Sequence, residues 1–313
     1  MSQDAFKTSR LLRENIERVV LGKPEVVQLL VTCLLAGDHV LLEDVPGVGK
    51  TLAAKAMAQS IEGHFSRLQF TPDLLPSDIT GNVIYRSDTR EFEFSPGPIF
   101  ANVVLADEVN RAPPRTQSAL LEAMSESKVS IDGTTHELPK PFIVVATQNP
   151  FEYEGTYSLP ESQLDRFLLR TSIGYPERDI ERQVLLTHRD GEPVNALKSV
   201  VSTDELLAAQ QTAREVKFEE TLMEYLLNIV EATRQHEGFQ VGVSTRGALS
   251  YYRGCQARAI TESRDYVTPD DIKALAVPCL AHRVLPRGIF QGANRSEVES
   301  ELSDVIQQIP VPV

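Results

Sequence analysis

Five short apolar runs in the first part of the chain constrain its fold most strongly. The runs are nearly continuous, and they lack the alternation of apolar and polar residues that marks a strand with one solvated face. Such runs are typical of parallel strands covered on both faces, and the segments between them are long enough for crossover helices. We therefore predict an α/β domain with a parallel sheet. The predicted strands are His39–Glu43, Phe65–Phe70, Val103–Asp107, Pro141–Thr147 and Phe167–Ile173.

The chain changes character around Gly174–Pro176. Beyond this point the strand patterns stop, and apolar residues recur at helical spacing. Ser202 and Glu205 have the spacing of a capping box at the start of one such stretch. We predict an α/β domain over residues 1–175 and an all-helical domain over residues 176–313.

Two stretches inside the first domain exceed what a connection between strands requires. Residues 71–100 separate two predicted strands with far more chain than a crossover needs. Residues 128–139 carry Asp132 and Gly133 between alternating residues, which strongly indicates a β-hairpin. We predict that both stretches are inserts, with ordinary surface loops as an equal alternative on the local pattern alone.

The segment EDVPGVGKT, residues 43–51, predicts a phosphate-binding turn between the first strand and a helix. Backbone amides and the positive end of a helix bind phosphate oxygens, and glycines let the backbone approach them closely. The lysine supplies a charge for the terminal phosphates, and the threonine supplies a hydroxyl ligand for Mg²⁺. A surface turn that caps a helix is the alternative. The candidate nucleotide-binding residues are Pro46, Gly47, Val48, Gly49, Lys50, Thr51 and Leu52.

Asp44 departs from the strict phosphate-loop pattern. That pattern, G-x-x-x-x-G-K-[ST], has a glycine where this chain has Asp44. The first glycine opens the turn and does not itself clasp phosphate, so we expect the substitution to be tolerated. We expect the carboxylate of Asp44 to point away from the bound phosphates.

A second polar feature is the pair Asp107 and Glu108, which stands at the C-terminal end of the apolar strand in NVVLADEVN, with Asp107 lying 57 residues beyond Lys50. Ligands of open α/β sheets bind at the carboxyl ends of the strands, where these two acids are expected. Asp107 is suited to hold Mg²⁺ together with Thr51, and Glu108 is suited to take a proton from an attacking water. Two acids after a strand often mark only a helix start, but together with a phosphate turn they predict a nucleotide site.

Three further residues are candidates for the same chemistry, each with a simpler alternative. Asn149 ends another apolar run and could orient the attacking water, although an Asx-type turn before a proline explains it equally well. Arg166 could reach the γ-phosphate of a neighbouring subunit, or it could be a solvated arginine. Arg246 could contact phosphates from the start of a helix, or it could simply be solvated there.

Composition excludes several other classes of protein. The net charge of −13 leaves no basic half, so nucleic-acid binding is not favoured. Three widely spaced cysteines do not form a disulfide or zinc pattern and fit a reducing compartment. The apolar runs are too short to span a bilayer, and the N-terminal stretch resembles an amphipathic helix more than a signal peptide. We expect a cytoplasmic protein.

Taken in their order along the chain, the motifs resemble those of the MoxR family of AAA+ ATPases, in the helix-2-insert branch. The resemblance covers residues 22 to about 285, and it departs from the family pattern at Asp44 and in GVSTR, where GASPR is usual. The stretches that carry it are VPGVGKT, TPDLLPSDITG, FSPGPIFANVVLADEVNRAPPRTQSALLEAMSE, VVATQNP, LPESQLDRF and VGVSTRGALS with DYVTPDDI.

This resemblance implies a P-loop core with a five-stranded parallel sheet of order 5-1-4-3-2, followed by a helical lid. It also implies a residue-by-residue assignment in which Arg111 and Arg115 compete for the role of the arginine finger. The implied roles are ATP–Mg²⁺ binding by Lys50 and Thr51, a Walker B pair of Asp107 and Glu108, sensor 1 at Asn149, the finger at Arg166 and sensor 2 at Arg246.

The resemblance further implies ATP hydrolysis in a ring, commonly a hexamer, whose inserts face a central pore. Members of the family are considered chaperone-like remodelling ATPases that assist the maturation of protein complexes. Their usual partner carries a von Willebrand factor type A domain. The alternatives are a nucleic-acid-stimulated motor, a magnesium-chelatase-type subunit and a scaffold that binds ATP without hydrolysing it.

Overall fold

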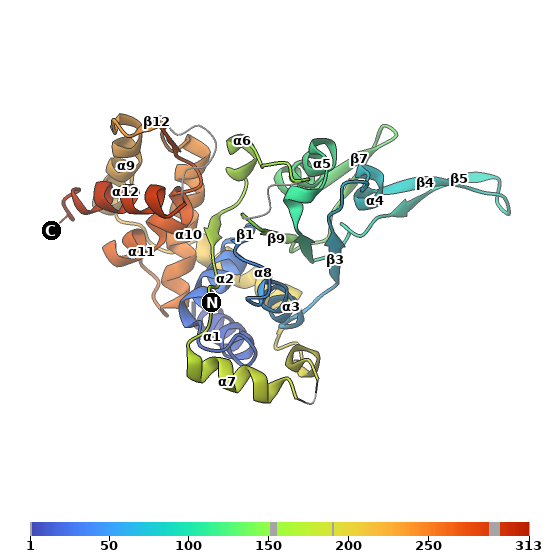
Figure 1. Ribbon diagram of the computed structural model, residues 1–313, viewed down its shortest axis with the longest axis horizontal. Helices are drawn as coiled ribbons and strands as arrows, with labels where there is room; N and C mark the ends of the chain where they lie inside the picture. Colours follow the sequence, from blue (N-terminus) through green and yellow to red (C-terminus); the bar gives the residue numbers. More distant parts are fainter. Residues whose placement is uncertain (1, 151–154, 190, 288–294, 313) are drawn as a thin grey trace.

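The sheet predicted from the five apolar runs is present in the computed structural model, which describes residues 2–150, 155–189, 191–287 and 295–312 (Figure 1). All neighbouring strands are parallel, in the order β10-β1-β9-β6-β3, which is the predicted order 5-1-4-3-2. The strands are β1 (Val40–Glu43), β3 (Phe65–Gln69), β6 (Val103–Asp107), β9 (Ile143–Gln148) and β10 (Leu169–Thr171).

Both faces of the sheet are buried along β1, β6 and β9, which explains the continuous apolar runs there, whereas the edge strand β3 exposes Arg67 and Gln69. Successive side chains of a strand point to opposite faces, and along β6 they enter two separate hydrophobic clusters. Val103 and Leu105 pack in a cluster with α1 (Ser2–Glu17), α2 (Pro24–Ala36) and α3 (Lys50–Gln59). Val104 and Ala106 pack on the other face with α5 (Pro114–Glu126).

The two predicted inserts form hairpins that project from the body of the protein (Figure 1). The first contains α4 (Pro76–Thr80), β4 (Gly81–Arg86) and β5 (Glu91–Pro96), and its hairpin extends far from the sheet. The second pairs β7 (Lys128–Ile131) with β8 (Thr134–Glu137). Asp132 and Gly133 join these two strands with φ angles of 47° and 79°, the conformation expected of a two-residue type I′ turn.

Helices dominate the second part of the chain. Ser202 caps α8 as its spacing predicts, because its hydroxyl accepts the Glu205 amide while the Glu205 carboxylate accepts the Ser202 amide. The helices there are α7 (Arg178–Thr187), α8 (Thr203–Arg214), α9 (Glu220–Gln235), α10 (Thr245–Thr261), α11 (Pro269–Leu280) and α12 (Arg295–Gln307).

Three very short strands correct the prediction that this part contains helices alone. β11 (Val201–Ser202) pairs with β2 (Ile61–Glu62), and β12 (Phe239–Val241) pairs with β13 (Leu285–Pro286). Strands of two or three residues are too short to produce a period-2 pattern, so the sequence gives no indication of them.

The predicted boundary at residue 175 lies within continuous packing. One hydrophobic cluster contains Leu12 and Val27 from the first part together with Leu206 and Tyr251 from the second. Helix α10 packs against α2, and α8 packs against both α1 and α2. The division at residue 175 therefore stays a prediction. Among the described residues, no helix is long and apolar enough to cross a membrane.

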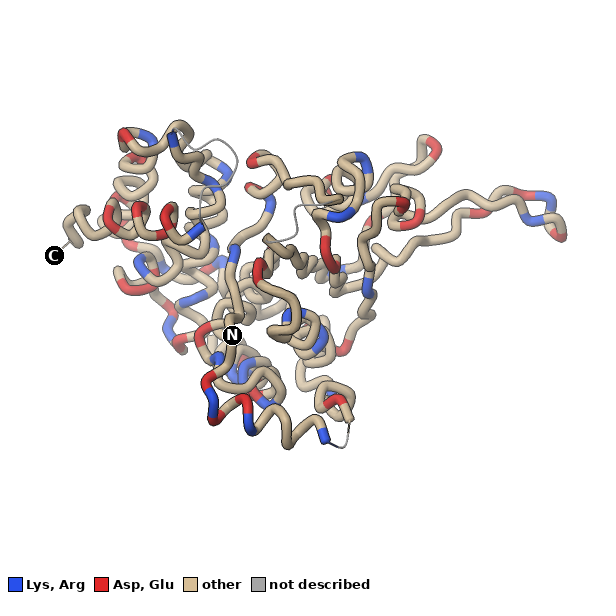
Figure 2. Tube along the Cα trace, in the orientation of Figure 1, with Lys and Arg blue, Asp and Glu red and all other residues tan. Residues whose placement is uncertain are grey.

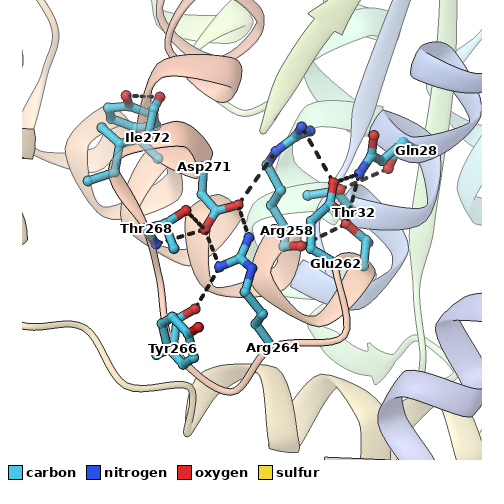
Figure 3. A network of polar contacts seen from close by, with 11 residues as sticks. Gln28, Thr32, Arg258, Glu262, Arg264, Tyr266, Thr268, Asp271 and Ile272 are labelled. Carbon is cyan, nitrogen blue, oxygen red and sulfur yellow. Dashed lines mark hydrogen bonds and ion pairs between the residues drawn. The ribbon is translucent and has the colours of Figure 1, made fainter.

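A polar network stabilises the far end of α10 and the start of α11 (Figure 3). The carboxylate of Asp271, whose side chain is 2% exposed, accepts two hydrogen bonds of 2.7 and 2.8 Å from the guanidinium of Arg264. It also accepts the backbone amide and the hydroxyl of Thr268, which caps α11. Gln28 of α2 donates to Glu262 at the end of α10, so α2 is tied to the same network.

We predict that Asp271→Ala lowers the free energy of unfolding by about 2 kcal/mol, because it removes the buried carboxylate that caps α11 and pairs with the partly exposed Arg264. Urea denaturation followed by circular dichroism measures this change. Glu14→Ala is the control, because its ion pair with Arg10, at 3.9 Å, is exposed and contributes at most about 0.5 kcal/mol. Equal losses in the two variants would contradict the importance given to the buried network.

Candidate active site

The predicted phosphate turn connects the C-terminal end of β1 to the first residue of α3. Gly47 and Gly49 have φ angles of 83° and 96°, a backbone region that residues other than glycine rarely adopt. No atom lies within 4 Å of the position that a Cβ would occupy on either glycine. Gly49 is the N-cap of α3 and offers no side-chain acceptor, so the first amides of the helix are available to an anion.

The remaining turn residues fix this cradle to the protein. Val48 and Leu52 pack against the hydrophobic cluster beneath the turn, whereas Pro46 is exposed. The ammonium group of Lys50 donates to the carbonyl oxygen of Val45 at 2.9 Å and to that of Asp44. The lysine therefore lies across its own turn, at the place where it can meet a phosphate.

The carboxylate of Asp44, which replaces the first glycine of the phosphate-loop pattern, is held by backbone amides. Its carboxylate accepts the backbone amides of Ile173 at 2.9 Å and of Gly174 at 2.6 Å through Oδ2, and that of Val45 at 2.8 Å through Oδ1. Ile173 and Gly174 lie just beyond β10, so Asp44 ties the turn to this neighbouring strand. Its carboxylate is engaged there and does not enter the cradle.

Glu43, the last residue of β1, lies beneath the turn between two arginines. Arg170 of β10 approaches its carboxylate at 3.2 Å, and Arg295 at the start of α12 approaches at 3.8 Å. Burial lowers the pKa of Arg170, and the negative charge of Glu43 opposes that shift. This ion pair holds β1 and β10 together directly below the cradle.

The two acidic candidates lie where the sequence predicts, at the C-terminal end of β6. Asp107 accepts a hydrogen bond of 2.6 Å from Arg67 on β3 and one of 2.7 Å from the hydroxyl of Thr147 on β9. The same hydroxyl accepts the amide of Glu108 at 2.9 Å. Thr147 therefore fixes the orientation of both acids.

Glu108 has a φ of 58°, which is unusual for a residue with a side chain and is common at functional sites. Its carboxylate accepts the side-chain amide of Gln69 at 2.8 Å and lies 3.3 Å from the guanidinium of Arg111. Three neighbouring groups thus hold this carboxylate and its backbone in one position.

The register of the sheet brings the phosphate turn, Asp107 and Glu108 to the same side of the sheet, the edge formed by the C-terminal ends of the strands. Leu42 of β1 is level with Thr147 of β9, and Ala106 of β6 is level with Ala146. β1 and β6 are separated only by β9, so Asp107 lies roughly 10 Å to the side of the end of β1. Asn149 is buried at the same edge, one residue beyond β9, and its carbonyl oxygen accepts the side-chain amide of Asn110.

Arg166 lies at the opposite edge, which is formed by the N-terminal ends of the strands. It precedes β10 by three residues, and Leu169 is level with Val40 at the beginning of β1. Its guanidinium donates to the carbonyl oxygen of Leu121 at 2.5 Å and to the hydroxyl of Ser125, both on α5. The full length of a strand separates Arg166 from the phosphate turn of its own chain.

The other candidate arginines lie in different surroundings. Arg111 contacts Glu108 within its own chain, and Arg115 is exposed in the first turn of α5. Arg246 is exposed in the first turn of α10, whose N-cap Ser244 donates to Asp165 at 2.9 Å. The described contacts therefore connect the start of α10 to the Arg166 segment and not to the phosphate turn.

The donor set fits a magnesium ion bound together with phosphate. Mg²⁺ prefers oxygen ligands and commonly uses one or two protein groups, with waters and substrate phosphates completing its shell. Thr51 and Asp107 offer a hydroxyl and a carboxylate of this kind. The residues described in the structure contain no cluster of three or more histidine, cysteine or acidic side chains that could hold a metal without such help.

Sequence reasoning missed three residues of this site, Arg67, Gln69 and Thr147. Arg67 and Gln69 alternate with apolar residues on β3, so a period-2 pattern was available to indicate that they share one face. Their partners on β6 could be identified only from the register, which pairs Gln69 with Asp107. Thr147 had no distinguishing pattern, because threonine is common in strands.

Comparison with known proteins agrees with this geometry. Residues 39–169 match the model of the ATPase family associated with various cellular activities (AAA), and residues 231–306, called the lid region below, match an AAA lid domain. The chain is 48% identical to the uncharacterized protein YeaC of Bacillus subtilis, over 96% of this chain and 93% of that one. It is 41% identical to chaperone MoxR1 of Mycobacterium tuberculosis, over 95% and 80%.

A solved structure supports the same conclusion about the fold. The crystal structure of a candidate ATPase from Cytophaga hutchinsonii superposes with a TM-score of 0.88. The superposition covers 100% of this chain and 97% of that chain, at 35% sequence identity. The arrangement of sheet and helices is therefore shared over the whole length of the two proteins.

We predict that Asp44→Gly increases the rate of hydrogen exchange at the amides of Ile173 and Gly174, because both lose their carboxylate acceptor. The variant should also lose about 2 kcal/mol of unfolding free energy, since hydrogen bonds to charged groups are the stronger ones. Asp44→Asn retains an acceptor oxygen and should show a smaller effect. Unchanged exchange at both amides in Asp44→Gly would contradict the bridging role of Asp44.

Proposed function

Because this chain belongs to the MoxR family of AAA+ ATPases, we propose that it hydrolyses ATP in active centres shared between subunits of a ring. The observation that carries the proposal is the division of candidate residues between the two edges of one sheet. The phosphate turn, Asp107 and Glu108 meet at the carboxyl ends of the strands, whereas Arg166 lies at the other edge. An arginine in that position is too far from the phosphate turn of its own chain, so it could act only on a neighbouring subunit, after its guanidinium has left Leu121 and Ser125.

The chain's own residues suggest how the reaction is organised. The amides of the turn and Lys50 bind the phosphates, and Thr51 and Asp107 hold Mg²⁺, which neutralises charge on the phosphates. Glu108 accepts a proton from the attacking water, and Asn149 helps to position that water. Since Arg67 occupies Oδ2 of Asp107 at 2.6 Å, that guanidinium has to move or share the carboxylate when the metal binds.

Glu108 needs a fixed orientation to act as a base. Gln69 and Arg111 hold its carboxylate, and Thr147 holds its backbone amide. A carboxylate prepared in this way loses little orientational freedom when the substrate arrives. Release of the Gln69 contact would free the oxygen that takes up the proton.

The first projecting hairpin supports a role in remodelling a protein client. Tyr85 and Phe92 are 56% and 74% exposed near its outer half, with ring centroids 5.3 Å apart. Exposed aromatic pairs of this kind are typical of protein contact surfaces. We propose that the hairpin touches an apolar segment of the client, in agreement with the chaperone name of the Mycobacterium tuberculosis relative. A hexameric ring and a partner with a von Willebrand factor type A domain follow as family-level proposals.

The mixed charges of the same hairpin do not favour a nucleic-acid motor. Arginines and acidic residues lie close together toward its tip (Figure 2). Arg86 forms an ion pair with Glu93 at 2.7 Å, and Arg90 stands next to Glu91. A loop that follows a phosphate backbone needs unopposed positive charge, which this hairpin lacks.

We propose a cytoplasmic location, and the state of the cysteines supports it. Cys33, Cys255 and Cys279 are all buried and free, so none depends on an oxidising compartment. Burial raises the pKa of each thiol, that of Cys279 to about 12, which keeps the thiols protonated and unreactive.

We predict that Glu108→Gln lowers the turnover of ATP at least about 100-fold while leaving its binding intact, because only the proton acceptor is lost. A phosphate-release assay measures turnover, and a fluorescent ATP analogue measures binding. Lys50→Ala is the matched comparison and should lose binding as well. Hydrolysis near the parent rate in Glu108→Gln would remove Glu108 from the catalytic role.

We predict that Arg166→Ala lowers turnover about 1,000-fold without weakening ATP binding, because the finger acts on the neighbour's transition state. The measurement is the rate of phosphate release as a function of protein concentration. Arg115→Ala tests the competing assignment and should keep most of the activity. If the rate of Arg166→Ala still rises with concentration as the parent rate does, the finger is another residue.

A further inference from the structure

A buried arginine of the lid region contacts the segment that carries Arg166. Arg283, just beyond α11, has a side chain that is only 1% exposed. Its Nε donates to the carboxylate of Asp165 at 2.8 Å, forming an ion pair. A guanidinium has five N–H donors, and the others are directed at backbone carbonyl oxygens.

Those carbonyl oxygens lie on both sides of Arg166. Nη2 donates to the carbonyl of Asp165 at 3.3 Å and to that of Phe167 at 2.6 Å. Nη1 donates to the carbonyl of Leu168 at 3.0 Å and to that of Cys279 at the end of α11. Arg283 therefore holds the peptide groups that flank the candidate finger, although it does not touch the side chain of Arg166.

Two more lid residues contact the same segment. His282 contacts the carbonyl oxygen of Phe167 at 3.0 Å, and burial lowers the pKa of its imidazole well below the ordinary value. Ser244 donates its hydroxyl to Asp165 at 2.9 Å and accepts the amide of Gly247 as the N-cap of α10. Asp165 thus connects Arg283 with the first turn of α10, where Arg246 is located.

Arg283 is closely packed. A Cβ on Gly247 would lie 2.6 Å from Cδ of Arg283, so the absence of a side chain at residue 247 makes space for the arginine. Removing the carboxylate partner of a buried guanidinium is expensive. A movement of the lid region is therefore expected to carry residues 165–168 with it and not to detach from them.

We propose that Arg283 is a positioning residue for the arginine finger, and that Asp165, Arg283 and Ser244 transmit the lid position of one subunit to the active centre of the next. This inference rests on the proposed function, because it takes Arg166 as the shared finger. Arg295 of the lid region donates to the carbonyl oxygen of Glu43 at 3.0 Å, close before the phosphate turn, so the lid also contacts the nucleotide side of its own subunit. A displacement of the lid would shift the backbone of Arg166, which then enters or leaves the neighbouring centre.

Mixed rings test this inference. A Glu108→Gln subunit cannot hydrolyse ATP but keeps its finger, and an Arg166→Ala subunit keeps its hydrolytic residues but has no finger. A mixture of the two should hydrolyse ATP although neither does so alone, because the finger of one completes the centre of the other. The readout is phosphate release by the mixture.

Asp165→Asn is then added to one kind of subunit at a time. In the Glu108→Gln subunit it should lower the activity of the mixture about tenfold, because a finger displaced by a fraction of an ångström stabilises the transition state poorly. In the Arg166→Ala subunit it should leave the activity unchanged, because that subunit supplies no finger. A purely structural contact would lower the activity equally in both positions and would overturn the inference.

Two results distinguish a failure of the proposed shared centre from a failure of this inference alone. Loss of all activity in the unmodified mixture would remove Arg166 as the shared finger, and with it both the proposed shared centre and this inference. Activity in that mixture together with equal losses for the two placements would reject this inference alone. Thermal denaturation of each Asp165→Asn protein confirms that the folded protein is compared.

A second variant covers the case in which Asp165→Asn does not fold. Ser244→Ala removes the hydroxyl that bonds Asp165 and also removes the cap of α10. Ser202→Ala removes the comparable cap of α8, which lies outside the group formed by Asp165, Arg283 and Ser244. Ser244→Ala should lower the activity of the mixture only when the finger-bearing subunit carries it, and Ser202→Ala should lower it in neither placement. A loss that follows Ser202→Ala to the same degree would overturn the inference.

Discussion

The parallel sheet, whose central strands are buried on both faces, is the constraint on which the rest of the structure depends. Parallel strands place all their carboxyl ends at one edge, so a turn after β1, two acids after β6 and an asparagine after β9 are brought together without any specific attraction between them. The same geometry sends whatever precedes β10 to the other edge. Under the proposed function, a site at one edge and an arginine at the other require a second copy of the chain to complete the active centre.

Each charged group of the site is already held by a partner. The carboxylate of Asp44 binds backbone amides, Asp107 is held by Arg67 and Thr147, and Lys50 lies against carbonyl oxygens of its own turn. Fixed dipoles and charges of this kind reduce the reorganisation that a reaction requires. The lid region adds Arg283 on the opposite edge, where its ion pair with Asp165, together with the contact of Ser244, connects the segment before β10 to α10 and α11. Polar contacts therefore hold each edge of the sheet, as two separate sets.

Much of this architecture follows from local patterns in the sequence. The five strands, the Asp132-Gly133 hairpin and the Ser202 cap were predictable, because each depends on residues close together in the chain. The order of the strands depends on distant segments and was predicted only through the family resemblance. Contacts between distant residues were not. Neither the acceptance of the Ile173 and Gly174 amides by Asp44 nor the pairing of Arg283 with Asp165 has a period or spacing to reveal it. The roles of the site residues and the boundary at residue 175 stay predictions.

The proposed function places one ATP molecule between two subunits of this protein. A structure of the Glu108→Gln form assembled with ATP and Mg²⁺ tests this arrangement most directly. We expect the γ-phosphate beside Lys50 and Asp107 of one subunit, within hydrogen-bonding distance of the Arg166 guanidinium of the next. A γ-phosphate contacted only by residues of a single chain, or nucleotide bound away from the turn at residues 46–51, would contradict it.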